Sequence, residues 1–173
     1  DDGNGYTDDV YGIDARNHDT DPMDDHGHGT HCAGTIGAIG ENAIGVAGVC
    51  WRVRLMALKF ISAADQGEDY DAIKCIEYAV RMGARVINAS WGDDVYSQAL
   101  FDAIELARAS NVLFCAAAGN EHRNVDITPK YPACYTNANL VCVAASAPND
   151  ACAGFSNYGV TSVHLAAPGQ QVL

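Results

Sequence analysis

At the centre of the chain stands the run Arg85-Val86-Ile87-Asn88-Ala89-Ser90, whose β-branched residues predict a short strand. An amphipathic helix is predicted over 69–82, ending at Gly83, and a second over 97–110. Further strands are expected over 53–60, 112–116 and 140–144. Strands that alternate with helices in this way predict an α/β fold with a parallel sheet and right-handed crossovers.

Composition indicates an ordinary globular domain and argues against some partners. The chain has 173 residues, 49% of them hydrophobic, which is enough for one domain with a buried core. Its net charge of -12 argues against nucleic acid and anionic membranes, because both need basic patches on their protein partners. No run approaches the roughly 18 apolar residues of a transmembrane helix, so no membrane span is predicted.

Seven cysteines are many for this length, and none has the Cys-x-x-Cys spacing of a zinc site. Cys32 and Cys75 lie in helical patterns and are expected to be buried thiols. We expect an oxidising compartment, with one or two disulfide bridges among the last four cysteines, Cys115, Cys134, Cys142 and Cys152.

A second informative run is His28-Gly29-Thr30-His31-Cys32-Ala33-Gly34, which predicts an imidazole in the first turn of a helix of small residues. A hydrolase with a serine nucleophile needs a neutral imidazole to accept the hydroxyl proton. Taken alone, His28 is also typical of a core histidine. A zinc site of His26, His28 and His31 is another alternative, although no matching Cys or carboxylate ligand set follows.

Five runs, in order, resemble the subtilisin-like serine proteases. They are the histidine run above, Asn42 to Val49, Val86 to Gly92, Ala117 to Asn120, and Ala166 to Gly169. The cysteine within the histidine run is similar to the proteinase K, thermitase and protozoan branches. The resemblance implies a three-layer α/β/α fold with a mainly parallel sheet. Residues 1–173 would be the central part of one catalytic domain, incomplete at both ends.

The resemblance also implies roles for single residues. His28 would be the general base, and Asn120 would donate its side-chain amide to the oxyanion of the tetrahedral intermediate. A protein or peptide substrate would bind as an added strand. The implied substrate contacts are Ser90, Trp91, Gly92 and Gly119. Ordinary turn chemistry at strand ends is the alternative for these segments.

Structural Ca²⁺ is the expected cofactor, because nine of the 22 acidic residues fall in positions 1–25 among Asn and Gly. A solvated acidic face is the alternative. An EF-hand-like loop would supply Asp2, Asn4, the Tyr6 carbonyl and Asp9. A thermitase-like loop would supply Asp14, Asn17, Asp19, Asp21 and the Met23 carbonyl. A third, weaker loop would supply Asn42 and the carbonyls of Gly40, Ile44 and Val46.

Two hypotheses follow from the resemblance. In the first, the chain is part of a calcium-stabilised serine endopeptidase with a Ser-His-Asp triad, whose Asp precedes residue 1 and whose Ser follows Leu173. Residues 1–173 alone would then be inactive. In the alternative, the chain is a non-catalytic, calcium-binding pseudoprotease domain. Family habit also implies an inhibitory prodomain outside these residues and a secreted or vesicular location.

Overall fold

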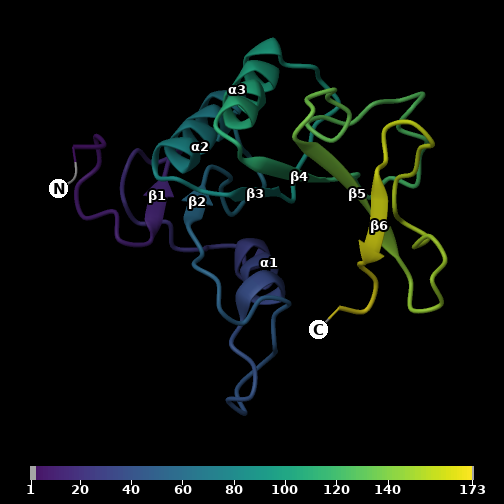
Figure 1. The fold of residues 1–173 in the computed structure, drawn as a ribbon, viewed down its shortest axis with the longest axis horizontal. Helices are drawn as coiled ribbons and strands as arrows, with labels where there is room; N and C mark the ends of the chain where they lie inside the picture. The colour runs from purple at the N-terminus through teal and green to yellow at the C-terminus, as the bar shows by residue number, and fades with distance from the viewer. Residues whose placement is uncertain (1–2, 173) are drawn as a thin grey trace. The chain divides into compact units, whose positions relative to one another are not determined.

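The computed structural model describes residues 3–172, and residues 1, 2 and 173 lie outside the described part. The chain divides into two compact units, residues 1–81 and 82–173. Each unit has its own helices and parallel strands, which are labelled in Figure 1. The α/β class and the parallel pairing agree with the sequence-based prediction.

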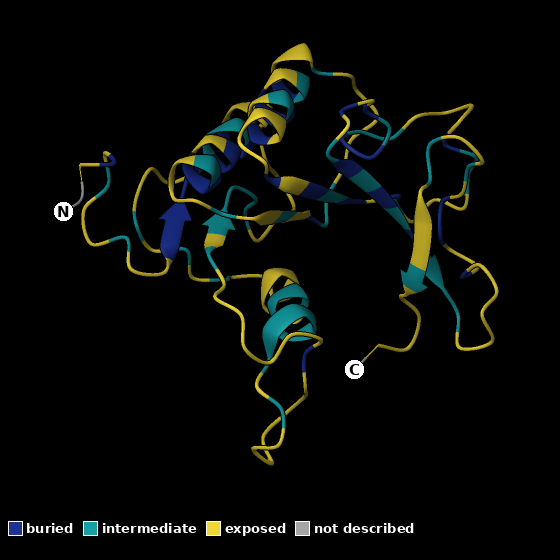
Figure 2. Ribbon diagram, in the orientation of Figure 1, coloured by how far each residue is buried: buried dark blue, intermediate teal, exposed yellow. Residues whose placement is uncertain are grey.

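The first unit contains two short parallel strands. β1 (Gly12–Asp14) pairs with β2 (Ala57–Lys59), and the register places Asp14 opposite Lys59. β2 is the centre of the strand predicted over 53–60. β1 is not among the predicted strands, because its three residues include one large apolar side chain. It is nevertheless buried along its whole length, as Figure 2 shows.

Two helices complete the first unit. α1 (His28–Gly37) is the predicted helix of small residues. α2 (Asp69–Arg81) matches the helix predicted over 69–82, and Gly83 follows it with a φ of 77°, as expected of a helix-ending glycine. One buried cluster joins α2 to the end of β1: Ile13, Ala15, Cys75 and Tyr78.

The second unit is built on one sheet with the strand order β3-β4-β5-β6, in which every neighbouring pair is parallel. The strands are β3 (Val86–Ala89), β4 (Leu113–Ala117), β5 (Leu140–Ser146) and β6 (Leu165–Pro168). The first three confirm predicted strands. β6 was assigned no secondary structure from the sequence, and its residues are mostly exposed, so it lacks the apolar run of a buried strand.

α3 (Gln98–Ala109) connects β3 to β4 and confirms the helix predicted over 97–110. The Oγ of Ser97 accepts a hydrogen bond from the backbone N–H of Leu100 at 3.4 Å and so caps the helix. The buried face of α3 is the one predicted, with Leu100, Ala103, Ile104 and Ala107. Figure 1 shows α3 beside β4, whose Phe114 is fully buried.

The expected disulfides are contradicted, since all seven cysteines are free thiols. Cys115 pairs with Val141 across β4 and β5, so the neighbouring Cys142 faces the opposite side of the sheet. Cys75 is buried as predicted, and burial raises the pKa of its thiol to about 12. Cys32 is only half-buried, which corrects the prediction for that residue. Among the described residues, no helix combines the length and apolarity needed to cross a bilayer.

Candidate active site

Gly119 and Asn120 follow β4 at the carboxyl edge of the four-stranded sheet. A hollow of about 240 Å³ lies at this edge and is lined by Asn88, Ser90, Gly119, Asn120, Ser156 and Pro168, among others. Ligand sites of parallel sheets gather at the carboxyl ends of the strands. The structure therefore brings three of the predicted residues, Ser90, Gly119 and Asn120, to one hollow. Trp91 and Gly92 follow Ser90 along the chain but do not line it.

A buried amide that sequence reasoning missed contacts this region. Asn157 is fully buried, and its Nδ2 donates to the carbonyl of Ala118 at 2.8 Å and to Oε2 of Glu121 at 2.6 Å. Its Oδ1 accepts from the backbone N–H groups of Glu121 and Arg123, each at 3.1 Å. Its own backbone N–H donates to the carbonyl of Gly119 at 2.9 Å. One residue thus contacts the loop on both sides of Asn120.

Charged side chains surround the same loop. Lys130 donates to Glu121 at 2.8 Å, and both Lys130 and Arg123 form ion pairs with Asp94. Partial burial acts to raise the pKa of Glu121, but hydrogen bonds from Lys130 and Asn157 hold it below its ordinary value. Glu121 is therefore ionised at neutral pH. Because the pairs lie near the surface, we expect each to add only about 0–1 kcal/mol of stability.

The start of α1 is organised by Asp24. Its Oδ2 accepts hydrogen bonds from the N–H of Thr30 at 2.8 Å and from its hydroxyl at 2.6 Å. Its Oδ1 accepts from the N–H groups of His26 and Gly27. These bonds, the hydroxyl of Thr30 first, hold the pKa of Asp24 well below its ordinary value. The carboxylate occupies the place of a capping side chain, because Gly27 at the N-cap has none.

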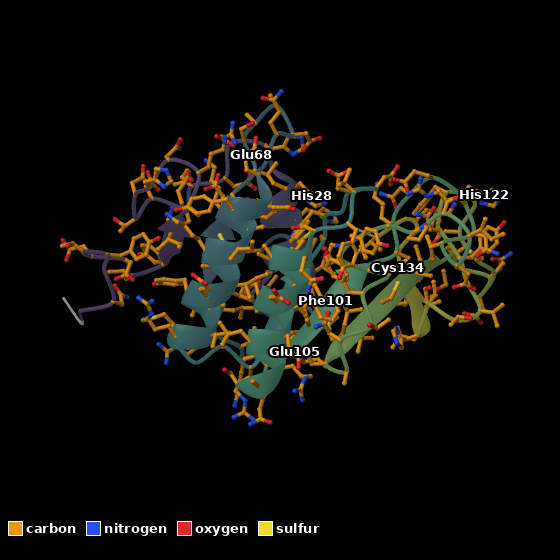
Figure 3. All side chains as sticks on the ribbon, turned by 90° about the horizontal axis from the view of Figure 1, so that it is seen from above. His28, Glu68, Phe101, Glu105, His122 and Cys134 are labelled. Carbon is orange, nitrogen blue, oxygen red and sulfur yellow. The ribbon has the colours of Figure 1, made fainter. Side chains whose placement is uncertain are left out.

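His28 is the first residue of α1 and is exposed, which contradicts the core-histidine alternative (Figure 3). Its Nε2 lies 3.9 Å from Sγ of Cys32, one helical turn further on. His26 packs edge-on to it, with the ring centroids 6.5 Å apart. His28 belongs to the first unit and Asn120 to the second, so their convergence on one reacting group stays a prediction.

The acidic loop, defined as residues 14–25, contains the second predicted calcium set. Asp14 is fully buried, and its carboxylate accepts from the N–H and from Nδ2 of Asn17, each at 2.9 Å. Asp19 and Asp21 accept backbone N–H groups within the loop. These oxygens are therefore already used as hydrogen-bond acceptors.

An ammonium group from β2 enters the acidic loop. Lys59 Nζ lies 3.4 Å from Oδ2 of Asp14 and 2.9 Å from Oδ2 of Asp25. It also donates to the carbonyl of Met23 at 2.9 Å. The cation of the protein itself thus contacts two of the oxygen groups predicted to bind metal, those of Asp14 and Met23. As arranged, this set does not fit a divalent ion.

The first predicted calcium loop shows a similar arrangement. Asp2 lies outside the described residues. Asn4 is buried, and it donates to Oδ2 of Asp9 at 2.7 Å while its Oδ1 accepts from the N–H of Tyr6. Asp9 also accepts from the hydroxyl of Tyr78 at 2.5 Å. These predicted ligand groups are paired with one another and with α2.

The Asn42 loop, defined as residues 39–47, is different. It encloses a hollow of about 140 Å³ lined by its own residues. Three alternate residues, Glu41, Ala43 and Gly45, adopt left-handed backbone with φ of 57–58°. This conformation is costly for Ala and Glu and persists where the surroundings impose it. A ring of backbone and Asn42 oxygens around a hollow fits a hard cation.

The Asn42 loop also packs on a tryptophan. A Cβ at Gly40 would lie 2.4 Å from the ring of Trp51, so only glycine fits there. Gly48 is as tightly placed, 2.5–2.8 Å from backbone atoms of α1 and of Ala38. These contacts fix both ends of the loop against the first unit.

Within residues 3–172, no three His, Cys, Asp or Glu side chains form a group that could hold a metal ion. This bears on the zinc alternative and on the two acidic calcium sets, which need several carboxylates at one point. The Asn42 loop relies on carbonyl and amide oxygens instead. Which residues bind metal stays a prediction.

Comparisons with known proteins point in one direction. The sequence profile described as "Subtilase family" matches residues 1–173, the whole chain. Subtilisin-like protease 2 of Plasmodium falciparum (isolate 3D7) is 36% identical over 170 residues, 96% of this chain and 12% of that protein. Thermitase of Thermoactinomyces vulgaris is 36% identical over 163 residues, 94% of this chain and 56% of that protein.

A solved structure, that of a cold-adapted subtilisin-like serine proteinase, matches with a TM-score of 0.81 at 32% identity. The match covers 93% of this chain and 55% of that chain. The fold is therefore subtilisin-like. The chain spans about half the length of thermitase and of the solved proteinase, and a smaller share of the Plasmodium protease.

Proposed function

The chain belongs to the subtilase family, and on that premise we propose that it is part of a serine endopeptidase that hydrolyses peptide bonds in proteins. His28 acts as the general base and Asn120 as an oxyanion donor. The serine and aspartate of the triad come from parts of the polypeptide outside residues 1–173. The observation that carries the proposal is the family match over the whole chain, with His28 and Asn120 both present.

The chemistry assigned to these residues is that of acyl transfer. The exposed imidazole of His28, at the start of α1, accepts the hydroxyl proton of the serine as it attacks the carbonyl carbon. The side-chain amide of Asn120 donates a hydrogen bond to the oxygen that becomes negatively charged. The position of Asn120 at the rim of a hollow supports this role, because a substrate carbonyl can approach it from solvent.

The substrate is a protein or peptide bound in extended form. Ser90, Trp91 and Gly92 follow β3, which is an edge strand of the four-stranded sheet. We assign main-chain pairing with the substrate to this segment, in the manner of strand addition. Gly119, whose left-handed backbone permits the turn after β4, contributes the opposite wall.

Calcium is the structural cofactor in this proposal, and the Asn42 loop is its best-supported site. Asn42 and carbonyls of the loop would hold the ion, which would offset the strain of Glu41 and Ala43. The protein acts in a secreted or vesicular compartment, where calcium is plentiful. An inhibitory prodomain outside residues 1–173 is part of the same proposal.

The test compares variants of the full polypeptide that contains residues 1–173. Wild type should cleave casein and be blocked by a serine-directed inhibitor. His28→Ala should lower kcat by about 10⁴-fold or more. Asn120→Ala should lower kcat by about 10²–10³-fold, a magnitude borrowed from subtilisin, where removal of such a donor has that effect.

The matched control is His18→Asn, because His18 is exposed and Asn tolerates its left-handed backbone. This variant should keep wild-type activity, and residues 1–173 alone should cleave nothing. Wild-type polypeptide that folds but shows no inhibitor-sensitive cleavage would support the pseudoprotease alternative instead.

A further inference from the structure

Asn157 uses every hydrogen-bonding position of its side chain. An amide group has two N–H donors and two lone pairs on oxygen, and all four are engaged, with Ala118, Glu121 and Arg123. The side chain is 0% exposed, so water does not compete for these bonds. Buried polar groups that are fully satisfied fix a single local geometry.

The partners of Asn157 all belong to one loop, residues 118–123. They lie on both sides of Asn120, while Asn120 itself is exposed and makes none of these bonds. Close packing adds to the restraint. A Cβ at Gly119, where φ is 103°, would lie 2.4 Å from Nδ2 of Asn157. The loop therefore has little room for a second conformation.

Asn157 is itself anchored to the sheet. The neighbouring Ser156 is 1% exposed, and its Oγ accepts from the N–H of Ala145 in β5 at 2.9 Å. The same hydroxyl donates to the carbonyl of Asn157 at 3.0 Å. A continuous path of hydrogen bonds thus runs from β5 through Ser156 and Asn157 to the loop after β4.

We propose that Asn157 is a positioning residue that fixes the loop 118–123 and thereby the direction of the Asn120 amide toward the reacting carbonyl. The inference rests on the proposed function, since it needs Asn120 to act on the oxyanion. Oxyanion stabilisation depends on donors that are in place before charge develops. A loop that must reorganise loses this advantage in the transition state, and ground-state binding of the substrate changes little.

Two variants test this in the full polypeptide. Asn157→Ala removes all four bonds. Asn157→Asp keeps the size and the two accepted bonds but loses both donors. Each should lower kcat by about 10–100-fold with KM nearly unchanged, in line with the effect of small misplacement of a catalytic group. The control is Asn137→Ala, because Asn137 is a buried amide of the same unit that bonds to Phe101 and Glu105 of α3.

The decisive readout is the double variant with Asn120→Ala. If Asn157 acts through Asn120, adding Asn157→Asp to Asn120→Ala should lower kcat by less than twofold more, although each single change is large. A merely structural role would multiply the two losses. Multiplied losses, or a fall in kcat for Asn137→Ala equal to that for the Asn157 variants, would overturn the inference.

Failure of the proposed function gives a different pattern. In that case Asn120→Ala itself leaves kcat unchanged, or wild type shows no inhibitor-sensitive cleavage. If Asn120→Ala is impaired while folded Asn157→Asp keeps full kcat, the positioning role is wrong and the proposed function stands.

Discussion

The acidic loop and the Asn42 loop flank α1 in the sequence, and calcium is predicted for both, yet their contacts differ. The acidic loop has five aspartates, and its oxygens accept internal N–H groups and the ammonium of Lys59. The Asn42 loop has one acidic residue, Glu41, and lines a hollow with its own residues. The loop with less charge is thus the better candidate for an ion.

The difference shows that a count of carboxylates is a poor guide to a cation site. A carboxylate can cap a helix, as Asp24 does, or pair with a cation of the protein, as Asp14 and Asp25 do. Metal binding requires several oxygens to be directed at one point and to lack better partners. Backbone conformation achieves this in the Asn42 loop.

The largest expected effect comes from removing the internal cation. Lys59→Met leaves the carboxylate of Asp14, with 1% side-chain exposure, without its charged partner. Breaking a buried pair in this way should lower the free energy of unfolding by about 3 kcal/mol, measured by urea denaturation. Added calcium should restore part of the loss in this variant, because the oxygens of the acidic loop are released.

Lys74→Met is the control, since Lys74 contacts the ring of Tyr70 rather than a buried carboxylate. It should cost less than about 1 kcal/mol. If Lys59→Met were no more costly than the control, Lys59 would not be what holds the acidic loop, and the contrast between the loops would disappear.

Calcium removal should affect the two loops differently. Excess EGTA should lower the Tm of wild type, corresponding to about 2.7 kcal/mol if calcium was present at 100 times its Kd. Asn42→Ala should abolish most of this EGTA effect. Asp21→Ala, which removes a carboxylate from the acidic loop, should leave it intact. An EGTA effect that follows Asp21 and ignores Asn42 would reverse the comparison.

Alkaline pH provides a third test. Hydrogen bonding to Asp25, with the charge of Asp14, raises the pKa of Lys59 above its ordinary 10.5. A raised pKa means that this contribution to stability is fully present below about pH 10.5 and is lost as the pH rises through the folded-state value. Stability of wild type relative to Lys59→Arg, which does not titrate there, should therefore fall only above about pH 10.5. A fall already at pH 8–9 would contradict this assignment.

The smallest effect concerns strain in the Asn42 loop. Ala43 has a φ of 58°, which glycine adopts without penalty. In EGTA, Ala43→Gly should raise the free energy of unfolding by about 0.5 kcal/mol, the difference between relieved strain and added chain entropy. Ala138→Gly, at an exposed position without positive φ, should instead destabilise by about 0.5–1 kcal/mol. Equal effects of the two changes would show that the loop stores no strain.

Sequence reasoning succeeded where the signal was local. The helices α2 and α3 carry a 3.6-residue apolar period, and β3, β4 and β5 are β-branched or apolar runs between them. β1 and β6 were missed because neither has an apolar run long enough to detect. The histidine and asparagine segments were found through family resemblance, and their chemical roles stay predictions.

The missing information was contact between distant residues. Lys59 is 34 residues from Asp25, and Asn157 is 39 residues from Ala118. No periodicity or spacing links such pairs, and an isolated Lys or Asn has many ordinary uses. Their roles depend on strand register and on how two loops pack, which only coordinates supply.

The packing of Trp51 against Gly40 gives the Asn42 loop its own optical reporter. Indole fluorescence responds to the polarity around the ring, and the chain has only two tryptophans. Replacing Trp91 by Phe would leave one emitter seated on the loop. Its spectrum would then register ion entry in real time, without any attached dye.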